Sequence, residues 1–214
     1  RDLLKLYEGI DKKKLQENMK YWLEAIMPVC DEYDINMCVH PDDPPYPVFG
    51  LPRIIGTAED IQWMLDAVPN KHNGLTFCAG SFSAGEHNDC VAMAKQFADR
   101  THFVHLRSCY IFPNGNFTEA SHLGGRADLI ELCRIFEKAE LEGKCNSGRR
   151  LPMRVDHGMT FTDKPGGVFD ESTHGHNAGY TLLGRMFAMG QIQGVIATVD
   201  RELGIEYKQP GFYD

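Results

Sequence analysis

The sequence predicts an α/β fold in which parallel strands alternate with helices along the chain. Two observations lead to this prediction. Short runs of strand-forming residues recur four times, and the segments between them have the apolar spacing typical of helices. The strand-like runs are 35–39, 75–77, 102–104 and 151–155. In proteins of this class the carboxyl ends of the strands lie on one face, where ligand-binding groups collect.

The first part of the chain contains a helix, a strand and a second helix. An apolar stripe with three- to four-residue spacing predicts the first helix between residues 11 and 29. The stripe consists of Leu15, Met19, Leu23 and Ile26. After the strand at 35–39, a proline-rich loop at 41–52 excludes helix. Thr57 is a typical N-cap residue, and it predicts a second helix that continues through Val68.

The middle of the chain repeats this alternation. The strand at 75–77 is followed by a predicted helix at 88–98. After the strand at 102–104, a loop is expected from 107 to 125. The next predicted helix includes residues 129–136, where apolar side chains recur on one side.

The last part of the chain is less periodic. The strand at 151–155 precedes a glycine-rich stretch at 158–179 without clear periodicity. A final helical region is predicted from about 181 to 203. We expect Gly190 and Gly194 to interrupt this helix, because glycine is unfavourable inside helices.

The length and composition predict one domain over residues 1–214, since 214 residues with 43% hydrophobic content can bury a single core. An eight-unit βα barrel needs about 250 residues, so four units resemble half of one. Three explanations are possible: the amino-terminal strands are absent from this chain, the four units form an open sheet, or two chains complete each other. We favour the first alternative. We also expect a homo-oligomer, most simply a dimer.

The charge and cysteine content limit the partners and the location. A net charge of −8 argues against nucleic-acid or anionic-membrane partners, although it permits a small anionic substrate. No apolar run approaches the roughly 20 residues of a membrane span, and no signal peptide is visible. The seven cysteines lack paired spacing, which favours reduced thiols and a cytoplasmic location.

Each of the four strand-like runs leads directly into a residue that can bind a metal. These residues are His40, Cys78, His105 and Asp156. If the strands are parallel, two imidazoles, a thiolate and a carboxylate meet at one edge of the sheet. By its chemistry, this set suits borderline metals such as Zn²⁺, Fe²⁺ or Co²⁺, because thiolate is a soft ligand.

Several stretches closely resemble signatures of the mannonate dehydratase family. They are HPDDPP at 40–45, NGLTFCAGS at 73–81, FVHLRS at 103–108, PMRVDHG at 152–158 and AGY at 178–180. The resemblance is colinear from about Met37 to Val199. It implies a TIM barrel akin to the xylose-isomerase group, with the first strands preceding Arg1. It also implies dehydration of D-mannonate to 2-keto-3-deoxy-D-gluconate in hexuronate breakdown.

The resemblance also implies roles for individual residues. His40, Cys78, His105 and Asp156 match the family's metal ligands, and the metal that the family uses is Mn²⁺. His157 matches its catalytic histidine, and Tyr180 matches its catalytic tyrosine. Because tyrosine is a poor base at its usual pKa near 10, we expect His157 to act as the base and Tyr180 as the acid.

Three further residues are candidates for binding the substrate. Arg107 and Arg154 flank two of the predicted ligands, where an arginine can hold a sugar-acid carboxylate or form a structural ion pair. His122 fits the family pattern and is expected to face the substrate. Asp42 and Asp43 are interpreted as turn residues that precede proline.

Two alternative functions remain open from the sequence. A metal-dependent sugar isomerase or epimerase would use the same kind of barrel and metal without losing water. A truncated, non-catalytic chain would keep the ligands but lack the rest of the barrel. The 40–45 and 152–158 signatures favour the dehydratase.

Overall fold

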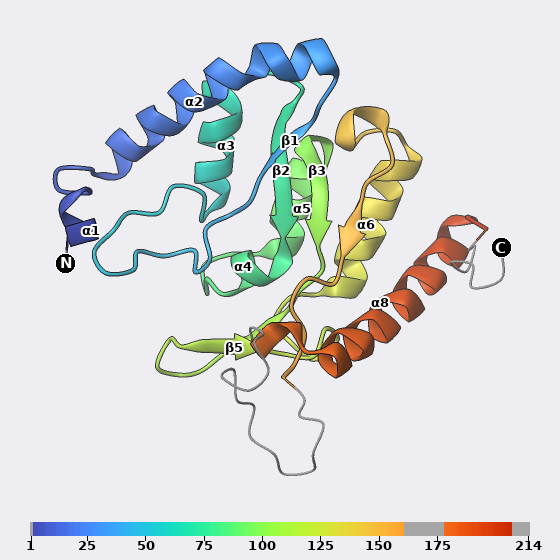
Figure 1. Cartoon of the computed structure of the whole chain (residues 1–214). Coiled ribbons are helices and arrows are strands. Elements are labelled where there is room, and N and C mark those ends of the chain that lie inside the picture. Colours follow the sequence, from blue (N-terminus) through green and yellow to red (C-terminus); the bar gives the residue numbers. More distant parts are fainter. Residues whose placement is uncertain (1, 161–177, 207–214) are drawn as a thin grey trace.

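The computed structural model describes residues 2–160 and 178–206, and it is built around one parallel sheet (Figure 1). The strands are β1 (Met37–Val39), β2 (Asn73–Cys78), β3 (Thr101–His105) and β6 (Met153–Arg154), paired in the order β1-β2-β3-β6. All three pairings are parallel. The predicted α/β fold with parallel strands is therefore confirmed. In the described residues this sheet is open, with β1 and β6 at its edges.

Helices separate the strands along the chain, as predicted. The longer ones are α2 (Lys12–Tyr33), α3 (Ala58–Ala67), α5 (Cys90–Phe97), α6 (Leu129–Leu141) and α8 (Leu182–Leu203). The shorter ones are α1 (Asp2–Lys5), α4 (Ala79–Ser83) and the 3₁₀ turns η1 (Ala98–Arg100), η2 (Asn146–Gly148) and η3 (Ala178–Tyr180). Figure 1 shows α2 and α3 on the β1 side of the sheet, and α6 and α8 on the β6 side.

Side-chain caps determine where several of these helices begin. The predicted cap at Thr57 is confirmed, because its hydroxyl accepts a hydrogen bond from the backbone N–H of Asp60 at 3.2 Å. Asp89 accepts two backbone hydrogen bonds in the same way at the start of α5. Thr181 caps α8 by accepting from the N–H of Gly184. Each cap satisfies donors that the first helical turn leaves without a partner.

The core lies between the sheet and the helices that cover it. Every residue of β2 is buried, as expected for a central parallel strand with both faces covered. Phe77 on this strand packs against Phe82 and Phe136, with ring centroids 5.2 and 5.1 Å apart. Leu23 of α2 and Leu132 of α6 are fully buried in the same cluster. The core thus fixes β2 between the two groups of helices.

The predicted loop at 107–125 is wrong in one important respect. It contains an antiparallel hairpin of β4 (Cys109–Ile111) and β5 (Phe117–Glu119). The turn includes Asn114 and Gly115, and Gly115 has a φ of +82°. Asparagine followed by glycine is a common signal for a hairpin turn, since glycine adopts positive φ readily. In Figure 1 the hairpin lies beyond the carboxyl ends of the strands.

The predicted interruption of the last helix is also wrong. Helix α8 continues through Gly190 and Gly194, and a Cβ at either position would meet no atom within 4 Å. Helix packing explains this continuity. Ala188, Ile192 and Val195 are buried against the core, and this tertiary burial outweighs the low helix propensity of glycine.

Helix α8 also bears on the expectation that no segment could span a membrane. By length and composition alone, Leu182–Leu203 is long and apolar enough to cross one, with 28% of the most apolar window buried. A core helix of a soluble protein meets the same criteria, and α8 packs against α6. This one helix is therefore weak support for a membrane span.

We predict that His102 makes the fold sensitive to acid. Its ring is buried, and burial lowers its pKa from 6.5 to about 4. The unfolded chain therefore takes up this proton first as the pH falls. Stability present above pH 6.5 is lost as the pH falls towards 4, by up to about 3 kcal/mol from this one group. Urea unfolding at several pH values measures the loss.

Two matched variants distinguish the effect of His102 on stability from that of the many carboxylates that titrate in the same pH range. His102→Gln should lose less stability than the wild type between pH 7 and pH 4.5. The same substitution at the exposed His87 should leave the wild-type pH dependence unchanged. Identical pH slopes for the wild type and His102→Gln would contradict the prediction.

Candidate active site and metal centre

The four residues predicted as metal ligands lie at one edge of the sheet. His40 follows β1, Cys78 ends β2, His105 ends β3, and Asp156 lies two residues beyond β6. Cys78 and His105 are direct partners in the parallel pairing of β2 with β3. The register of the strands therefore brings together side chains that are far apart in the sequence.

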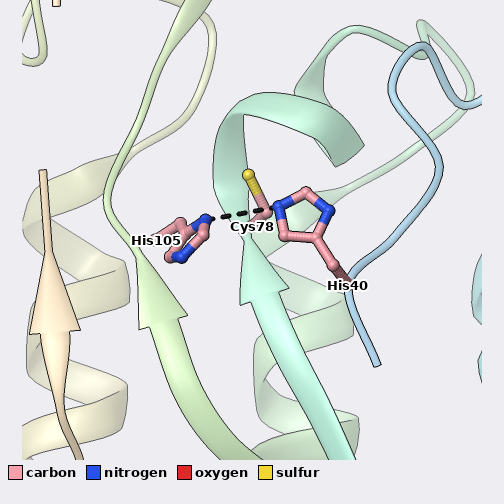
Figure 2. Close-up of side chains that lie close together, drawn as sticks. All are labelled: His40, Cys78 and His105. Carbon is pink, nitrogen blue, oxygen red and sulfur yellow. Dashed lines mark hydrogen bonds between the residues drawn. The ribbon is translucent and has the colours of Figure 1, made fainter. Parts of the chain in front are cut away.

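Three of these residues form a compact cluster, shown in Figure 2. The ligand atoms of His40, Cys78 and His105 all lie within 4.8 Å of one another. His40 Nε2 is 3.3 Å from His105 Nδ1, and His40 Nδ1 is 2.7 Å from the carbonyl oxygen of Pro41. A proton on Nδ1 donated to that carbonyl leaves the Nε2 lone pair facing the cluster. This donor set fits a divalent metal ion.

Asp156 lies beside this cluster and is linked to it through His105. Its Oδ2 is 3.5 Å from His105 Nδ1, but it is not part of the group whose ligand atoms all lie within 4.8 Å. Its Oδ1 accepts hydrogen bonds from Arg154 Nη2 at 2.9 Å and from the Tyr180 hydroxyl at 3.2 Å. Metal ligation by Asp156 therefore remains a prediction.

The charges at this edge favour the ionised form of Asp156. Burial raises the pKa of this carboxyl, but the hydrogen bond and charge of His105, together with the charge of Arg154, hold the pKa well below its usual range. Burial lowers the pKa of His105, but hydrogen bonds with Asp156 and Cys78 outweigh it, and the pKa is raised. An ionised carboxylate is the form that binds metals.

The two predicted catalytic residues lie next to each other at the same edge. The rings of His157 and Tyr180 are 4.6 Å apart between centroids. His157 Nε2 is 3.8 Å from Asp156 Oδ2, and its Nδ1 is 3.0 Å from Glu119 Oε1. Burial and the nearby charge of Asp156 raise the pKa of Tyr180. The structure thus brings an imidazole and a protonated phenol together beside the candidate metal ligands.

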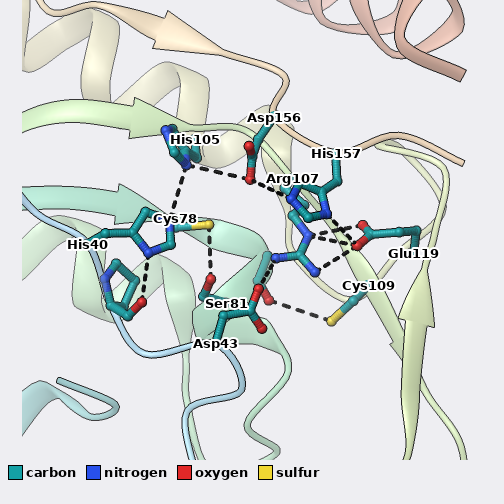
Figure 3. Close-up of polar contacts among 12 residues, drawn as sticks. His40, Asp43, Cys78, Ser81, His105, Arg107, Cys109, Glu119, Asp156 and His157 are labelled. Atoms are coloured by element: carbon teal, nitrogen blue, oxygen red, sulfur yellow. Dashed lines mark hydrogen bonds and ion pairs between the residues drawn. The ribbon is translucent and has the colours of Figure 1, made fainter. Parts of the chain in front are cut away.

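Arg107 does not have the open position expected of a substrate-binding residue. It is only 3% exposed. Its Nε and Nη2 donate to the carboxylate of Glu119, and its Nη1 donates to Asp43 at 2.5 Å (Figure 3). Both carboxylates belong to the same chain, so the contacts favour the alternative of a structural ion pair. The interpretation of Asp43 as a turn residue misses this contact.

His122 and Arg154 differ from each other in how far they are open to solvent. His122 is buried, and its Nε2 is 2.9 Å from the carbonyl oxygen of Val155, so its contacts are those of a packed core histidine. The expected contact between His122 and a substrate is therefore not supported. Arg154 keeps 37% of its side chain exposed while it donates to Asp156. Of the three predicted substrate-binding residues, Arg154 is the one that lies open to solvent at this edge.

Three residues of the site were not predicted in these roles. Glu119 contacts both Arg107 and His157, and Ser81 donates a hydrogen bond to the sulfur of Cys78 at 3.2 Å. Asp43 is the third. The Asn114-Gly115 turn signal could have revealed the hairpin that carries Glu119.

Residues 1–206 match the family model described as D-mannonate dehydratase (UxuA). The chain is 40% identical over 203 residues to mannonate dehydratase 2 of Agrobacterium fabrum. The matched region covers 94% of this chain and 49% of the relative. It is 37% identical over 206 residues to a mannonate dehydratase of Chromohalobacter salexigens. Here the matched region covers 96% of this chain and 51% of the relative.

A solved structure gives the same result. The crystal structure of mannonate dehydratase from Streptococcus suis serotype 2 is similar with a TM-score of 0.79 and 27% identity, over 96% of this chain and 55% of that chain. The chain therefore spans about half the length of these relatives. Because the family model matches nearly all of its residues, this chain belongs to the D-mannonate dehydratase (UxuA) family.

Proposed function

We propose that this chain supplies the catalytic edge of an enzyme that dehydrates D-mannonate to 2-keto-3-deoxy-D-gluconate and water, in hexuronate breakdown. The single observation that carries the proposal is the convergence of His40, Cys78 and His105, with Asp156 and His157 beside them. Membership of the family and the names of the relatives support the choice of reaction. The substrate is a small sugar acid.

The proposed cofactor is a divalent cation held by His40, Cys78, His105 and Asp156. The resemblance to the family favours Mn²⁺, whereas the cysteine thiolate favours Fe²⁺, Co²⁺ or Zn²⁺. When bound, such a cation supplies Lewis-acid stabilisation of negative charge on substrate oxygens. Availability in the cell can decide which metal occupies a site of this kind.

The proposed chemistry requires one proton to be removed and another to be supplied. Dehydration removes the proton from C2 and releases the C3 hydroxyl as water, and the resulting enol tautomerises to the 2-keto acid. We assign the base to His157, whose imidazole is suited to proton transfer near neutral pH. We assign the acid to Tyr180, because a phenol holds its proton at that pH.

Recognition of the substrate carboxylate is assigned to Arg154. Its guanidinium lies at the site, and 37% of its side chain is exposed. A planar guanidinium can donate two parallel hydrogen bonds to a carboxylate. Arg107 and His122 are not proposed to contact the substrate, since their polar atoms are occupied by partners in this chain.

The wider architecture is also a proposal. We propose that the four strands form part of a single-domain TIM (β/α)₈ barrel of the xylose-isomerase type, completed by further strands at the open edges of the sheet. The enzyme is proposed to be a cytoplasmic homodimer that binds neither nucleic acid nor membrane. The similarity to a mannonate dehydratase structure over 55% of its length supports the proposal that these strands are part of a larger fold.

Product analysis tests the proposed reaction. The whole protein, incubated with Mn²⁺ and D-mannonate, should form a 2-keto-3-deoxy acid that the periodate–thiobarbiturate reaction detects. An isomerase or epimerase would instead yield a sugar acid that keeps all its hydroxyl groups. That product would contradict the proposed dehydration while leaving the metal site intact.

We predict that Cys78 contributes directly to metal affinity. Cys78→Ser should weaken binding of Mn²⁺ and of Zn²⁺ by more than about tenfold. Loss of a residue that only supports a metal ligand already costs about tenfold or more in affinity, and loss of a ligand should cost more. Zn²⁺ should be affected more, because thiolate is a soft ligand. Calorimetric titration of the metal-free protein measures both affinities.

The control is a cysteine outside the site, and the contradicting result comes from two of the other proposed ligands. Cys133→Ala alters a buried cysteine in the core and should not change either metal affinity. The double variant His40→Ala, His105→Ala should bind no metal at this site. Full metal content in that double variant, measured by elemental analysis, would rule out the proposed ligand set.

We predict different failures for the metal ligand and the proton-transfer residues. Asp156→Asn should lose metal affinity and therefore also turnover, because a neutral amide is a weaker ligand. His157→Asn should retain metal and substrate binding but lose kcat by roughly 10²–10⁴, the usual scale for general acid–base catalysis. Tyr180→Phe should behave like His157→Asn, since it removes only a hydroxyl.

Deuterium exchange at C2 of the substrate separates the two proton-transfer roles. Tyr180→Phe should still exchange the C2 proton with D₂O, because it lacks only the acid that protonates the leaving group. His157→Asn should not exchange it. The reverse pattern would exchange the two roles, and normal turnover in both variants would exclude these residues from the reaction.

A further inference from the structure

A row of charged groups from three separate segments leads to His157 (Figure 3). Asp43 in the loop after β1 pairs with Arg107, which follows β3. Arg107 pairs with Glu119 at the end of β5. Glu119 in turn contacts His157, which follows β6, with 3.0 Å between its Oε1 and the His157 Nδ1. The row ends at the residue proposed to be the base.

The pairing of Arg107 with Glu119 is well defined in geometry. Nε is 3.0 Å from Oε2 and Nη2 is 2.7 Å from Oε1, so the guanidinium and carboxylate form two roughly parallel hydrogen bonds. Such bidentate pairs fix the orientation of both groups. Gly80 leaves space for the arginine, because a Cβ there would lie 2.3 Å from the Arg107 side chain.

These contacts keep Glu119 ionised. Burial raises the pKa of this carboxyl, but its hydrogen bonds, among them the bidentate pair with Arg107, outweigh burial, and its pKa is lowered. An ionised carboxylate can only accept hydrogen bonds. The nitrogen of His157 that faces it must therefore carry a proton.

This requirement selects one form of the His157 ring. When Nδ1 carries the proton of a neutral imidazole, Nε2 carries the lone pair. Nε2 is directed towards the edge where Asp156 lies, at 3.8 Å from its Oδ2. The atom able to accept a proton therefore faces the side of the ring where the candidate metal ligands lie.

We propose that Glu119 is a positioning residue that holds His157 as the Nδ1–H tautomer and fixes its ring, so that Nε2 is the atom that accepts a proton. Arg107, held by Asp43, orients Glu119. This proposal rests on the proposed function only where it makes His157 the base. The tautomer itself is a property of the protein without substrate or metal.

The first test measures the tautomer directly. Long-range ¹H–¹⁵N correlation spectra of the metal-free protein, with ¹⁵N-labelled histidine, report which ring nitrogen carries the proton. His157→Asn identifies the signals of His157. We expect Nδ1–H in the wild type and a shift towards Nε2–H in Glu119→Ala. Nε2–H in the wild type, or an unchanged tautomer in Glu119→Ala, would overturn the proposal.

A matched control separates this effect from damage to the hairpin. Thr118 is the exposed neighbour of Glu119 on β5. Thr118→Ala should leave the His157 tautomer and the kcat unchanged. If Thr118→Ala shifts the tautomer as strongly as Glu119→Ala does, the effect comes from the hairpin and the proposal fails.

Kinetics of the whole protein provide the second test. Glu119→Ala and Arg107→Lys should lower kcat at least about tenfold with little change in KM, because positioning is lost while the substrate contacts remain. A large rise in KM for Arg107→Lys with unchanged kcat would instead identify Arg107 as a substrate clamp and overturn the proposal. If the wild type does not dehydrate D-mannonate, the proposed function fails, while the spectra still decide the role of Glu119.

Discussion

The parallel register of β2 with β3 is the constraint on which the rest of the site depends. It pairs Cys78 with His105, and the next pairing sets His105 beside Arg154. A shift by one residue would turn every side chain of a strand to the opposite face. Both faces of β2 are buried, so such a shift would turn Phe77 away from Phe82 and Phe136, against which it packs in the core. The hydrophobic core therefore determines which side chains meet at the edge.

That edge carries several buried ionisable groups, among them Arg107 and Asp156, and burial of a charge is costly unless the charge is paired. Arg107 meets this requirement with two carboxylates, and Asp156 meets it with contacts to Arg154 and His105. Buried ion pairs often add little net stability, but loss of one partner leaves an unpaired buried charge. The network therefore serves mainly to fix the arrangement of the groups. This fits a site in which the direction of one histidine ring matters.

The sequence predicts the positions of the site residues better than it predicts their roles. His40, Cys78 and His105 are correctly placed because each ends or directly follows a strand, and strand ends in a parallel sheet share one edge. The role of Arg107 depends on a partner twelve residues later, and that partner is brought back by a hairpin. A prediction that treats this segment as a loop cannot bring Glu119 to the arginine. Roles set by pairing across such turns require the fold itself.

Asp156 combines a left-handed backbone conformation with a charged side chain, and its neighbour His157 points to a different partner. Adjacent residues here serve different groups, since Asp156 contacts His105 and Arg154 while His157 contacts Glu119. The backbone at Asp156 has a φ of +54°, in the left-handed region. Aspartate tolerates this region better than most residues, and it is also an anionic metal ligand. Asparagine would satisfy the backbone but lack the charge, whereas glutamate would supply the charge with a less suitable backbone preference. Position 156 therefore meets a conformational and an electrostatic demand with one residue type.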